Sequence, residues 1–477
     1  MSYRRRSFPH FVAATTTNLL MRVLFVTPEY APLVKVGGLG DVSAALPAAL
    51  RAIGHQVDIL LPGYGALLAK VEATEDEQRF AQLGFEARLR RAGELILVDC
   101  PPLFQREGTP YQDPGGQDWP DNPLRFGLLS RIAAELGARY DVIHCNDWPA
   151  ALTPAFAHAE KTLVTIHNLA FQGNYEPSWL SRLGLSDAMF TIERLEFHGH
   201  ISFLKAGLVY AAALNTVSPT YAREIQSAEH GCGFDGLLRA RADALSGILN
   251  GIDPEVWDPS RDPYLAARYD IENLHAKAKN KQELQRRLNL EVNADVPVLG
   301  FVGRLTHQKG ADLVAAAATE LLGLPAQIAV LGRGERGIEG ALAAVAARYP
   351  GRVAVAVEFD EALAHLIEAG SDVFLMPSRY EPCGLNQMYS QRYGTPPVAR
   401  ATGGLVDTVA DGESGFLFER AEASALAAAV RRALAVWREP ARWREMQRAG
   451  MQRDFSWRAA ARQYADLYSR LARARAF

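Results

Sequence analysis

Short apolar runs alternate with longer stretches of helical spacing along most of this chain. The first unit begins with the apolar run 22–26, continues through a helix in which Leu39, Val42 and Leu46 share one face, and ends with the run 57–61. Strands that alternate with helices in this way form parallel sheets, because each helix returns the chain to the same end of the sheet. The pattern therefore predicts an α/β protein built from βαβ units.

The same alternation continues to the end of the chain and predicts two sheets. We expect strands at 22–26, 57–61, 95–99, 141–145, 162–166 and 214–217 in the first half, and at 298–303, 327–331, 353–357, 372–376 and 396–399 in the second. The segment between the two sets, 250–297, is charged and is predicted to be helical. We place a domain boundary near Ser246–Asp258. The stretch 101–123 is rich in Pro, Gly and Asp and is long enough to suggest a functional loop or lid.

Composition narrows the class of protein. The chain has 477 residues, 48% of them hydrophobic, which is enough for two large domains with sizeable cores. A formal net charge of −3 gives no reason to expect a nucleic-acid or membrane partner. The four cysteines lie far apart with no CxxC pair, so neither a disulfide scaffold nor a zinc site is expected. No apolar run approaches the roughly 20 residues that span a bilayer. We expect an intracellular, cytoplasmic enzyme.

The first 20 residues differ from the rest of the chain. Three arginines, 4–6, precede a short apolar stretch that Pro9 and His10 interrupt, and no clean cleavage site follows. Met21 directly precedes the first predicted strand. We therefore interpret residues 1–20 as a disordered extension, or as the result of a start codon placed too early, rather than as a signal peptide.

The most informative chemistry lies in residues 378–387. The apolar run 372–376 leads into a turn that carries Glu381, Cys383 and Gly384, and a helical pattern follows. Ligands of open parallel sheets bind beyond the carboxyl ends of the strands, and free N–H groups at a helix start can hold an anion. One carboxylate beside such donors suggests chemistry on a phosphorylated or nucleotide-linked substrate. An ordinary loop with a surface Glu is the alternative.

Two glycine-rich segments share the pattern Gly-Gly-Leu-x-Asp. In the first, Lys35 precedes Gly37 and Gly38, which would let a ligand approach the backbone closely. The spacing before this lysine is wrong for a Walker loop. The second segment, 402–409, repeats the pattern in the other half of the chain. The repeat suggests two α/β domains facing one cleft, although a chance match in a glycine-rich chain remains the alternative.

Polar residues follow two strands of the first half. Asp147 comes after the strand 141–145, where it could bind a substrate hydroxyl or simply cap the next helix. His167 and Asn168 come after the strand 162–166. Because parallel strands end at one edge of a sheet, two such endings favour a binding site there over an isolated structural histidine.

Cations follow the first strand of the second half. Arg304 and Lys309 are spaced to reach a diphosphate, one with a planar fork and the other as a point charge. A solvated basic turn is the alternative. The chain has no Asp-x-Asp triplet, so paired cations would take the place of a metal. The segment 332–337 matches the dinucleotide fingerprint GxGxxG, but it lies in mid-chain and Arg333 would crowd a pyrophosphate.

Together these segments resemble a known family. From Met21 to its end the chain resembles bacterial glycogen synthases, the starch and glycogen synthase branch (glycosyltransferase family 5) of the retaining GT-B glycosyltransferases. The resemblance rests on the segments 35–41, 144–148, 165–169, 197–207, 217–224, 249–253, 304–310, 377–385 and 402–405.

The resemblance implies a GT-B fold, with two Rossmann-like domains of parallel sheets and the active site in the cleft between them. The domains would be an acceptor-side domain at 21–248, a nucleotide-sugar domain at 249–455, and a helix at 456–477 that returns to the first domain. The implied reaction transfers glucose from ADP-glucose to the non-reducing end of an α-1,4-glucan such as glycogen, with retention of configuration. It implies no metal and no cofactor.

The resemblance also implies roles for individual residues. Arg304 and Lys309 would bind the diphosphate and offset the charge that builds on the departing ADP. Glu381 would lie beside the sugar. Catalytic roles are implied for Glu381, Asp147, His167, Arg304 and Lys309, and substrate-binding roles for Lys35, Gly37, Gly38, Asp41, Asn168, Asn250, Cys383, Gly384, Leu385, Thr402 and Gly403.

Two positions depart from related patterns. Val36 stands where this family usually carries Thr, and Tyr389 stands where other GT-B families place a second Glu, which this branch generally lacks. One alternative is a related transferase that uses UDP-glucose or a small acceptor. Another is a glucan-binding protein without activity, which would not need Lys35, Arg304 or Lys309.

Overall fold

The computed structural model describes residues 20–157 and 159–473. The expectation of a disordered extension concerns residues 1–20, and all of these except Leu20 lie outside the described part. The chain forms two compact units. Unit 1 contains the described residues up to Val217, Ala222–Ile248 and those from Trp457 onward, whereas unit 2 contains Ser218–Tyr221 and Leu249–Ser456.

Unit 1 is built on a nine-stranded sheet with the order β12-β11-β7-β6-β1-β2-β5-β4-β3. Its strands from β12 to β5 run parallel, and β4 and β3 add an antiparallel hairpin at one edge. The strands are β1 (Arg22–Val26), β2 (Gln56–Pro62), β3 (Thr74–Gln82), β4 (Phe85–Ala92), β5 (Leu95–Asp99), β6 (Val142–Asn146), β7 (Thr162–Ile166), β11 (Ala213–Thr216) and β12 (Leu245–Gly247). A separate three-stranded sheet contains β8 (Asn174–Tyr175), β10 (His200–Ser202) and β9 (Glu196–Phe197).

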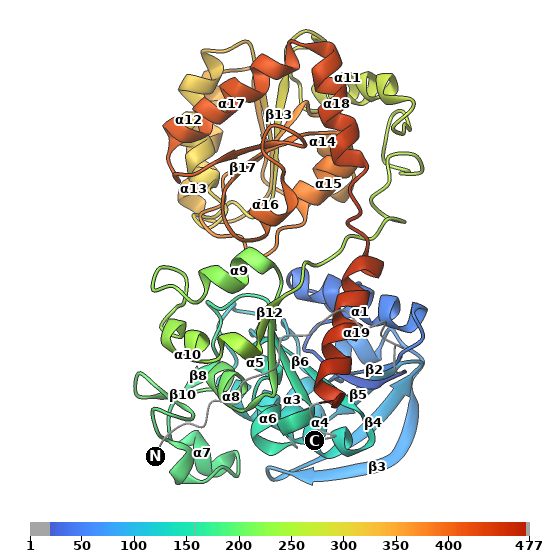
Figure 1. Cartoon of the computed structure of the whole chain (residues 1–477), viewed down its shortest axis with the longest axis vertical. Helices are drawn as coiled ribbons and strands as arrows, with labels where there is room; N and C mark the ends of the chain where they lie inside the picture. The colour runs from blue at the N-terminus through green and yellow to red at the C-terminus, as the bar shows by residue number, and fades with distance from the viewer. Residues whose placement is uncertain (1–19, 158, 474–477) are drawn as a thin grey trace. The chain divides into compact units, whose positions relative to one another are not determined.

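The helices of unit 1 (Figure 1) are α1 (Gly38–Ala52), α2 (Gly65–Leu68), α3 (Pro101–Phe104), α4 (Asn122–Leu136), α5 (Asp147–Ala150), α6 (Thr153–Phe156), α7 (Trp179–Arg182), α8 (Phe203–Tyr210), α10 (Asp235–Ala240) and α19 (Trp457–Arg473). Helices α1, α4, α5 and α19 contact strands of the large sheet. A further helix, α9 (Pro219–Glu224), begins within the short segment of unit 2 and ends in unit 1.

The last helix, α19, is bound to unit 1 by buried polar contacts as well as apolar packing. Tyr468 Oη lies 2.8 Å from His144 Nδ1, and Asn215 Nδ2 donates to Tyr464 Oη at 2.9 Å. Burial lowers the pKa of His144 to about 3, so this ring is neutral and can share hydrogen bonds without a buried charge. These bonds join the carboxyl-terminal helix to strands β6 and β11.

Unit 2 is built on a six-stranded parallel sheet with the order β15-β14-β13-β16-β17-β18. Its strands are β13 (Val298–Val302), β14 (Gln327–Leu331), β15 (Val353–Ala356), β16 (Val373–Met376), β17 (Pro397–Arg400) and β18 (Phe416–Phe418). The helices are α11 (Lys277–Arg287), α12 (Ala311–Leu322), α13 (Arg336–Arg348), α14 (Glu361–Gly370), α15 (Asn386–Arg392), α16 (Gly403–Thr408), α17 (Ala423–Trp437) and α18 (Pro440–Met451). Helices α12, α13 and α17 cover one face, and α11 and α14 the other (Figure 1).

The predicted fold class, two α/β domains with mostly parallel sheets, is confirmed. Each strand expected from an apolar run is present within one or two residues of its expected ends. Some elements were not predicted, and one expectation needs correction. The sequence did not predict the antiparallel hairpin β3–β4. The segment 250–297 is helical only over 274–287, because turns make up its first part and an irregular stretch follows the helix.

Aspartates organise that irregular segment. Asp253, Asp258 and Asp262 each accept a hydrogen bond from the backbone N–H two residues later, which is the pattern of Asx turns. Trp257 is stacked between the rings of His365 and Tyr389, with centroids 4.0 and 3.7 Å away. The aspartate turns and this aromatic stack explain why a charged segment lies ordered on unit 2 without forming a helix.

The loop predicted at 101–123 is also held in place. Only its first residues are helical, in α3, and α4 begins at Asn122. Arg106 forms an ion pair with Asp121 at 2.6 Å, and the buried guanidinium of Arg125 donates to the carbonyls of Leu103 and Pro110. Tyr111 within this loop reaches the carboxylate of Glu29.

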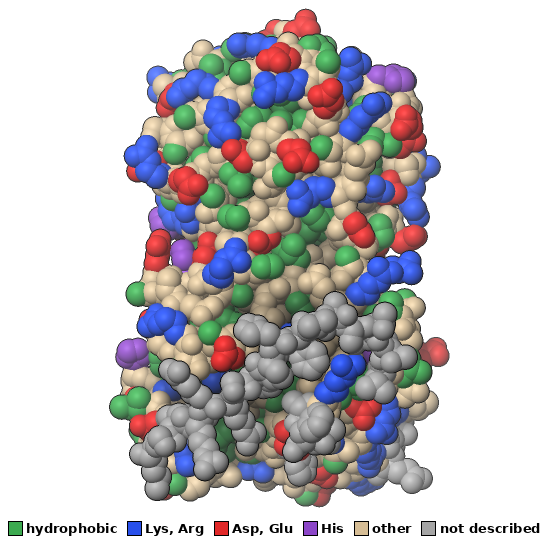
Figure 2. Space-filling model, viewed as in Figure 1, with side chains coloured by type: hydrophobic (Ala, Val, Ile, Leu, Met, Phe, Trp, Pro, Cys, Tyr) green, Lys and Arg blue, Asp and Glu red, His purple; other side chains and the backbone are tan. Residues whose placement is uncertain are grey.

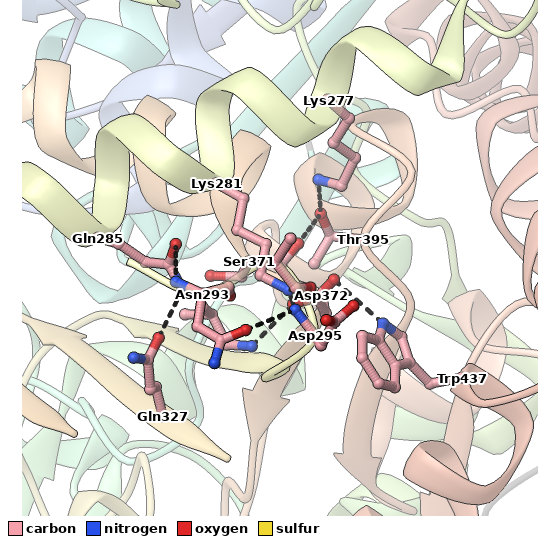
Figure 3. Close-up of polar contacts among 12 residues, drawn as sticks. Lys277, Lys281, Gln285, Asn293, Asp295, Gln327, Ser371, Asp372, Thr395 and Trp437 are labelled. Atoms are coloured by element: carbon pink, nitrogen blue, oxygen red, sulfur yellow. Dashed lines mark hydrogen bonds and ion pairs between the residues drawn. The ribbon is translucent and has the colours of Figure 1, made fainter. Parts of the chain in front are cut away.

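A buried polar cluster joins α11 to the amino-terminal edge of the unit 2 sheet (Figure 3). Lys281 Nζ lies 2.8 Å from Asp372 Oδ2, and Asp372 also accepts hydrogen bonds from the Val298 N–H and from Trp437 Nε1. Lys277 Nζ donates to the Ala369 carbonyl and to Thr395 Oγ1, both at 2.6 Å. Burial lowers the pKa of Lys277 to about 7.

The lowered pKa of Lys277 predicts a pH-dependent stability. Unfolded Lys277 keeps its proton up to its ordinary pKa of 10.5, whereas the folded side chain releases it near 7. The unfolded chain therefore binds more protons between these values, and the Lys277 contribution to the free energy of unfolding rises with pH by at most about 1.4 kcal/mol per unit. We expect the difference in urea-unfolding midpoint between the unmodified protein and Lys277→Met to grow in favour of the unmodified protein from pH 7 to 10. The exposed Lys279→Met is the control. A difference that stays constant with pH would contradict this account.

Candidate functional site

The carboxyl ends of β13 and β16 in unit 2 bring together the predicted residues Lys309 and Glu381. Glu381 is 4% exposed, and its Oε2 accepts hydrogen bonds from Lys309 Nζ at 2.6 Å and from Ser378 Oγ at 2.9 Å. A buried carboxylate is stable only when it is paired and hydrogen-bonded, and Lys309 and Ser378 supply these partners for Glu381. A small cavity of about 140 Å³ adjoins the pair and is lined by Phe301, Val302, Gly303, Lys309, Leu375, Met376, Ser378, Leu385 and Asn386.

Arg304 lies in the same loop as Lys309 but is exposed. Its Nη2 donates to Gln308 Oε1 at 3.1 Å, and Gln308 in turn approaches the carbonyl of Tyr380. In the described part of the chain Arg304 forms no ion pair with a carboxylate. A guanidinium held by a neutral amide keeps its charge available for an anionic ligand.

Away from this pair, positively and negatively charged side chains alternate over the surface of unit 2 (Figure 2). On the face drawn in Figure 2, Lys and Arg side chains are interspersed with Asp and Glu rather than gathered into one patch. A larger hollow of about 460 Å³ lies around Leu324, Gln327 and Arg352, at the opposite, amino-terminal edge of the sheet. The Lys309–Glu381 pair lies at the carboxyl-terminal edge, which is where ligands of open parallel sheets bind.

The turn after Glu381 was expected to open a helix at Gly384–Leu385. The helix α15 begins one residue later, at Asn386, and Gly384 has a left-handed φ of 74°. Cys383 is buried, and burial raises the pKa of its thiol to about 12, so it is neutral. Its sulfur interacts with the backbone N–H of Asn250, which brings another predicted residue to this turn.

Thr402 and Gly403 begin α16 against the same turn. The Gly404 N–H donates to the Glu381 carbonyl at 3.1 Å. A Cβ atom on Gly403 would lie 2.0 Å from that carbonyl oxygen, and one on Gly404 would lie 2.1 Å from the Cys383 carbonyl oxygen. These glycines are needed because backbone packs directly on backbone. Gly37 and Gly38 of unit 1 have no neighbour within 4 Å of such a Cβ, so the repeated pattern opens a helix in both units but performs different local tasks.

The segment 332–337 also uses its glycines for packing. A Cβ on Gly332 would lie 1.8 Å from the Gly303 carbonyl oxygen, and one on Gly334 would lie 2.2 Å from the Leu305 carbonyl oxygen. The match to the dinucleotide fingerprint is therefore explained by close contact with the loop that carries Arg304.

In unit 1, Lys35 of the loop before α1 forms an ion pair of 2.7 Å with Asp41 in the first turn of α1, so two predicted residues meet here. The sequence did not predict the part played by Glu29. Its Oε2 accepts hydrogen bonds from the N–H groups of Val36 and Gly37 at 2.7 and 3.0 Å, and Tyr111 Oη donates to Oε1 at 2.6 Å. Glu29 thus holds the glycine loop. Its place just after β1 was the available signal.

Asp147, His167 and Asn168 meet at the carboxyl ends of β6 and β7. Asp147 Oδ1 accepts hydrogen bonds from the N–H groups of His167 and Asn168 at 2.7 and 3.4 Å. Asp147 is the first residue of α5 and Asn146 is its cap, so the interpretation of Asp147 as a cap is wrong. Burial raises the pKa of Asp147 to about 7, and the two N–H donors oppose this shift.

His167 is neutral at physiological pH. Burial lowers its pKa to about 3, and its Nε2 lies 3.0 Å from Asn146 Oδ1. Asn146 Nδ2 donates to the Val26 carbonyl, so its oxygen faces the ring and Nε2 carries the proton. The opposite nitrogen, Nδ1, then has a lone pair that can accept a hydrogen bond from a hydroxyl.

The described residues contain no cluster of three or more His, Cys, Asp or Glu side chains that could hold a metal ion. Within the same residues, no helix is both long enough and apolar enough to cross a membrane.

The chain is similar to glucan synthases along nearly its whole length. Residues 22–240 match the family described as starch synthase catalytic domain, and residues 282–449 match glycosyl transferases group 1. It is 49% identical to the glycogen synthase of Nitrosomonas eutropha over 94% of this chain and 96% of that protein. It is 50% identical to the glycogen synthase of Aromatoleum aromaticum over 95% and 98%.

Solved structures agree with these relatives. The catalytic domain of starch synthase IV from Arabidopsis thaliana, bound to ADP and acarbose, matches with a TM-score of 0.84 and 32% identity over 95% of this chain and 100% of that one. Sucrose-phosphate synthase from Thermosynechococcus elongatus matches with a TM-score of 0.60 and 22% identity over 95% and 99%, and this likeness concerns the fold alone.

The contrast between the two glycine pairs predicts different effects of alanine. Gly404→Ala should force the Glu381 turn away from α16, which costs roughly 1–3 kcal/mol of stability for overpacking, or roughly 2–12 °C in Tm for a domain of this size. Gly38→Ala, which meets open space at the start of α1, should change Tm by less than about 2 °C. Thermal unfolding followed by circular dichroism measures both. Equal effects of the two substitutions would refute the packing role.

Proposed function

Because this chain belongs to the bacterial glycogen synthase family of glycosyltransferases, we propose that it transfers glucose from ADP-glucose to the non-reducing end of an α-1,4-glucan, with retention of configuration. The observation that carries the proposal is the Lys309–Glu381 pair with Arg304 nearby, at the carboxyl edge of the unit 2 sheet. A buried carboxylate paired with one cation, and a second cation in the same loop as the first, suit a reaction in which a diphosphate leaves a sugar.

In this proposal the cations of unit 2 act on the leaving group. As the bond between glucose and the diphosphate breaks, negative charge builds on the departing ADP. Arg304 and Lys309 offset that charge from fixed positions, which lowers the barrier more than it strengthens ground-state binding. Lys309 can bridge the diphosphate and Glu381, because its ammonium group has three N–H donors and Glu381 and the donor can each accept one.

Glu381 acts on the sugar. When the diphosphate departs, positive charge develops at the anomeric carbon, and a nearby carboxylate stabilises that charge or binds the sugar hydroxyls. Retention follows when the acceptor hydroxyl attacks from the face that the diphosphate leaves. The departing phosphate oxygen can then take the proton of that hydroxyl.

Unit 1 would bind hydroxyl groups. The carboxylate of Asp147 and the Nδ1 lone pair of neutral His167 both accept hydrogen bonds, and Asn168 can donate and accept. We propose that these three residues orient the glucose and the acceptor, and that Lys35 and the open glycines Gly37 and Gly38 contact the donor. The four cysteines are free, which is consistent with action in the reducing cytoplasm.

The exposed ring of Phe359 is a candidate to stack on the nucleobase of the donor. Its side chain is 83% exposed just beyond β15, at the same sheet edge as Arg304. An exposed aromatic ring beside a diphosphate site can stack on a base. Stacking alone separates adenine from uracil only weakly, so further base contacts would have to contribute to donor choice.

The cations predict a large effect on turnover. Lys309→Ala or Arg304→Ala should lower kcat by roughly 10²–10³, or about 3–4 kcal/mol of barrier, because each removes charge that stabilises the departing diphosphate. Steady-state release of ADP measures the effect, and Lys279→Ala on the exposed face of α11 is the matched control. A loss confined to KM would mean that these residues bind the donor without assisting its cleavage.

Donor choice tests the proposed function itself. We expect ADP release from ADP-glucose to require added glycogen, and kcat/KM for ADP-glucose to exceed that for UDP-glucose at least about tenfold, which needs only about 1.4 kcal/mol of discrimination. Equal or reversed preference would be compatible with a glucan synthase activity but would overturn the assignment of ADP-glucose as the donor. Absence of transfer from either donor would overturn the proposed activity.

A further inference from the structure

Three consecutive backbone carbonyls hold the turn that carries Glu381, and each uses a different donor. The Glu381 carbonyl accepts the Gly404 N–H of α16 at 3.1 Å, and the Cys383 carbonyl accepts Gln387 Nε2 of α15 at 3.0 Å. Between them, the Pro382 carbonyl accepts Ser218 Oγ at 2.6 Å. The turn is therefore fixed from outside, and its middle contact comes from a residue 164 positions away in the sequence.

Ser218 belongs to a segment whose role is still open. Residues 217–224 are one of the segments on which the resemblance to glycogen synthases rests, yet no role has been given to them so far. Ser218–Tyr221 is part of unit 2, although the residues on either side of it belong to unit 1. Ser218 is fully buried, and its hydroxyl both donates to the Pro382 carbonyl and accepts the Tyr221 N–H at 3.1 Å. A hydroxyl used twice in this way has a fixed orientation.

A second contact of the same segment reaches α16. The Thr220 N–H and Oγ1 donate to the two carboxylate oxygens of Asp407, at 2.8 and 2.7 Å. Asp407 lies on the helix whose first residues, Gly403 and Gly404, pack on the Glu381 turn. The segment thus contacts the turn directly through Ser218 and indirectly through α16, and the contacts form a closed ring.

We propose that Ser218, Thr220 and Asp407 are positioning residues of the transfer reaction, which fix the Glu381 turn and so hold the carboxylate beside Lys309. This inference rests on the proposed function. Glu381 Oε2 bonds Lys309 and Ser378 at 2.6 and 2.9 Å, and a shift of the turn by a few tenths of an ångström would lengthen both bonds. Electrostatic stabilisation depends on such preorganised distances, so loss of the ring should reduce turnover more than substrate binding.

A purely structural role makes a different prediction. A buried hydroxyl that donates to a carbonyl contributes about 1 kcal/mol to stability wherever it lies. Thr162 is the matched control, because it is buried and its Oγ1 donates to the Ala159 carbonyl at 2.6 Å, at the amino-terminal end of β7. Its removal should lower stability and leave turnover per folded enzyme unchanged.

The experiment compares kcat, the KM for ADP-glucose, the KM for glycogen, and Tm in the full chain. Ser218→Ala and Thr220→Val should lower kcat about tenfold or more, equivalent to about 1.4 kcal/mol, with both KM values within about twofold of the unmodified values. Thr220→Ser keeps the hydroxyl and should restore most of the turnover, and Asp407→Asn should resemble Thr220→Val. Thr162→Val should lower Tm without lowering kcat.

Each outcome bears on one claim. If the unmodified chain transfers glucose while Ser218→Ala and Thr220→Val keep kcat within about twofold, the positioning role is wrong and the proposed function stands. Failure of Thr220→Ser to recover activity, or an equal loss in Thr162→Val, also overturns the positioning role. If Ser218→Ala does not fold, the Thr220 pair decides alone. Absence of transfer by the unmodified chain overturns the proposed function and this inference with it.

Discussion

The ion pair between Lys309 and the buried carboxylate of Glu381 is the constraint on which the candidate site of unit 2 depends. A carboxylate that is 4% exposed is costly to bury unless it is paired and hydrogen-bonded, and the partners of Glu381 are Lys309 and Ser378. Lys309 and Glu381 follow different strands, so the pair also fixes the loop after β13 against the loop after β16. The same two groups supply the positive and negative charges that departure of a sugar diphosphate requires.

Close backbone packing makes this arrangement possible. A Cβ atom on Gly310 would lie 2.1 Å from the Pro377 carbonyl oxygen, and Gly332 and Gly404 show equally short approaches to neighbouring loops. Glycine at these positions lets the loops of unit 2 pack at distances that side chains forbid. In unit 1 the glycines of the similar loop remain open, and the carboxylate of Glu29 organises the loop instead. The glycines of the similar pattern therefore allow close backbone packing in unit 2, whereas in unit 1 they leave open space beside the backbone.

The sequence predicted those features that depend on local patterns. Central strands such as β1 and β13 are buried on both faces, so they appear as apolar runs and their positions were predicted closely. The hairpin β3–β4 was missed because its strands carry many charged residues and no apolar run, and the aspartate turns after residue 250 resembled a polar helix. The contact between Glu29 and Tyr111 spans 82 residues and that between Ser218 and Pro382 spans 164, so only the folded chain reveals them. That Asp147 meets His167, and Lys309 meets Glu381, could be predicted because parallel strands end at one edge of a sheet. The catalytic roles of these residues remain predictions.

The most direct test of the central claim is to follow the reaction of ADP-glucose with a short α-1,4-linked maltooligosaccharide by proton NMR, together with a count of ADP released. If Lys309, Arg304 and Glu381 act as proposed, one ADP should appear for each new α-1,4 linkage, and the added residue should carry an α-anomeric proton. A β-anomeric product, or release of ADP without lengthening of the acceptor, would contradict the account.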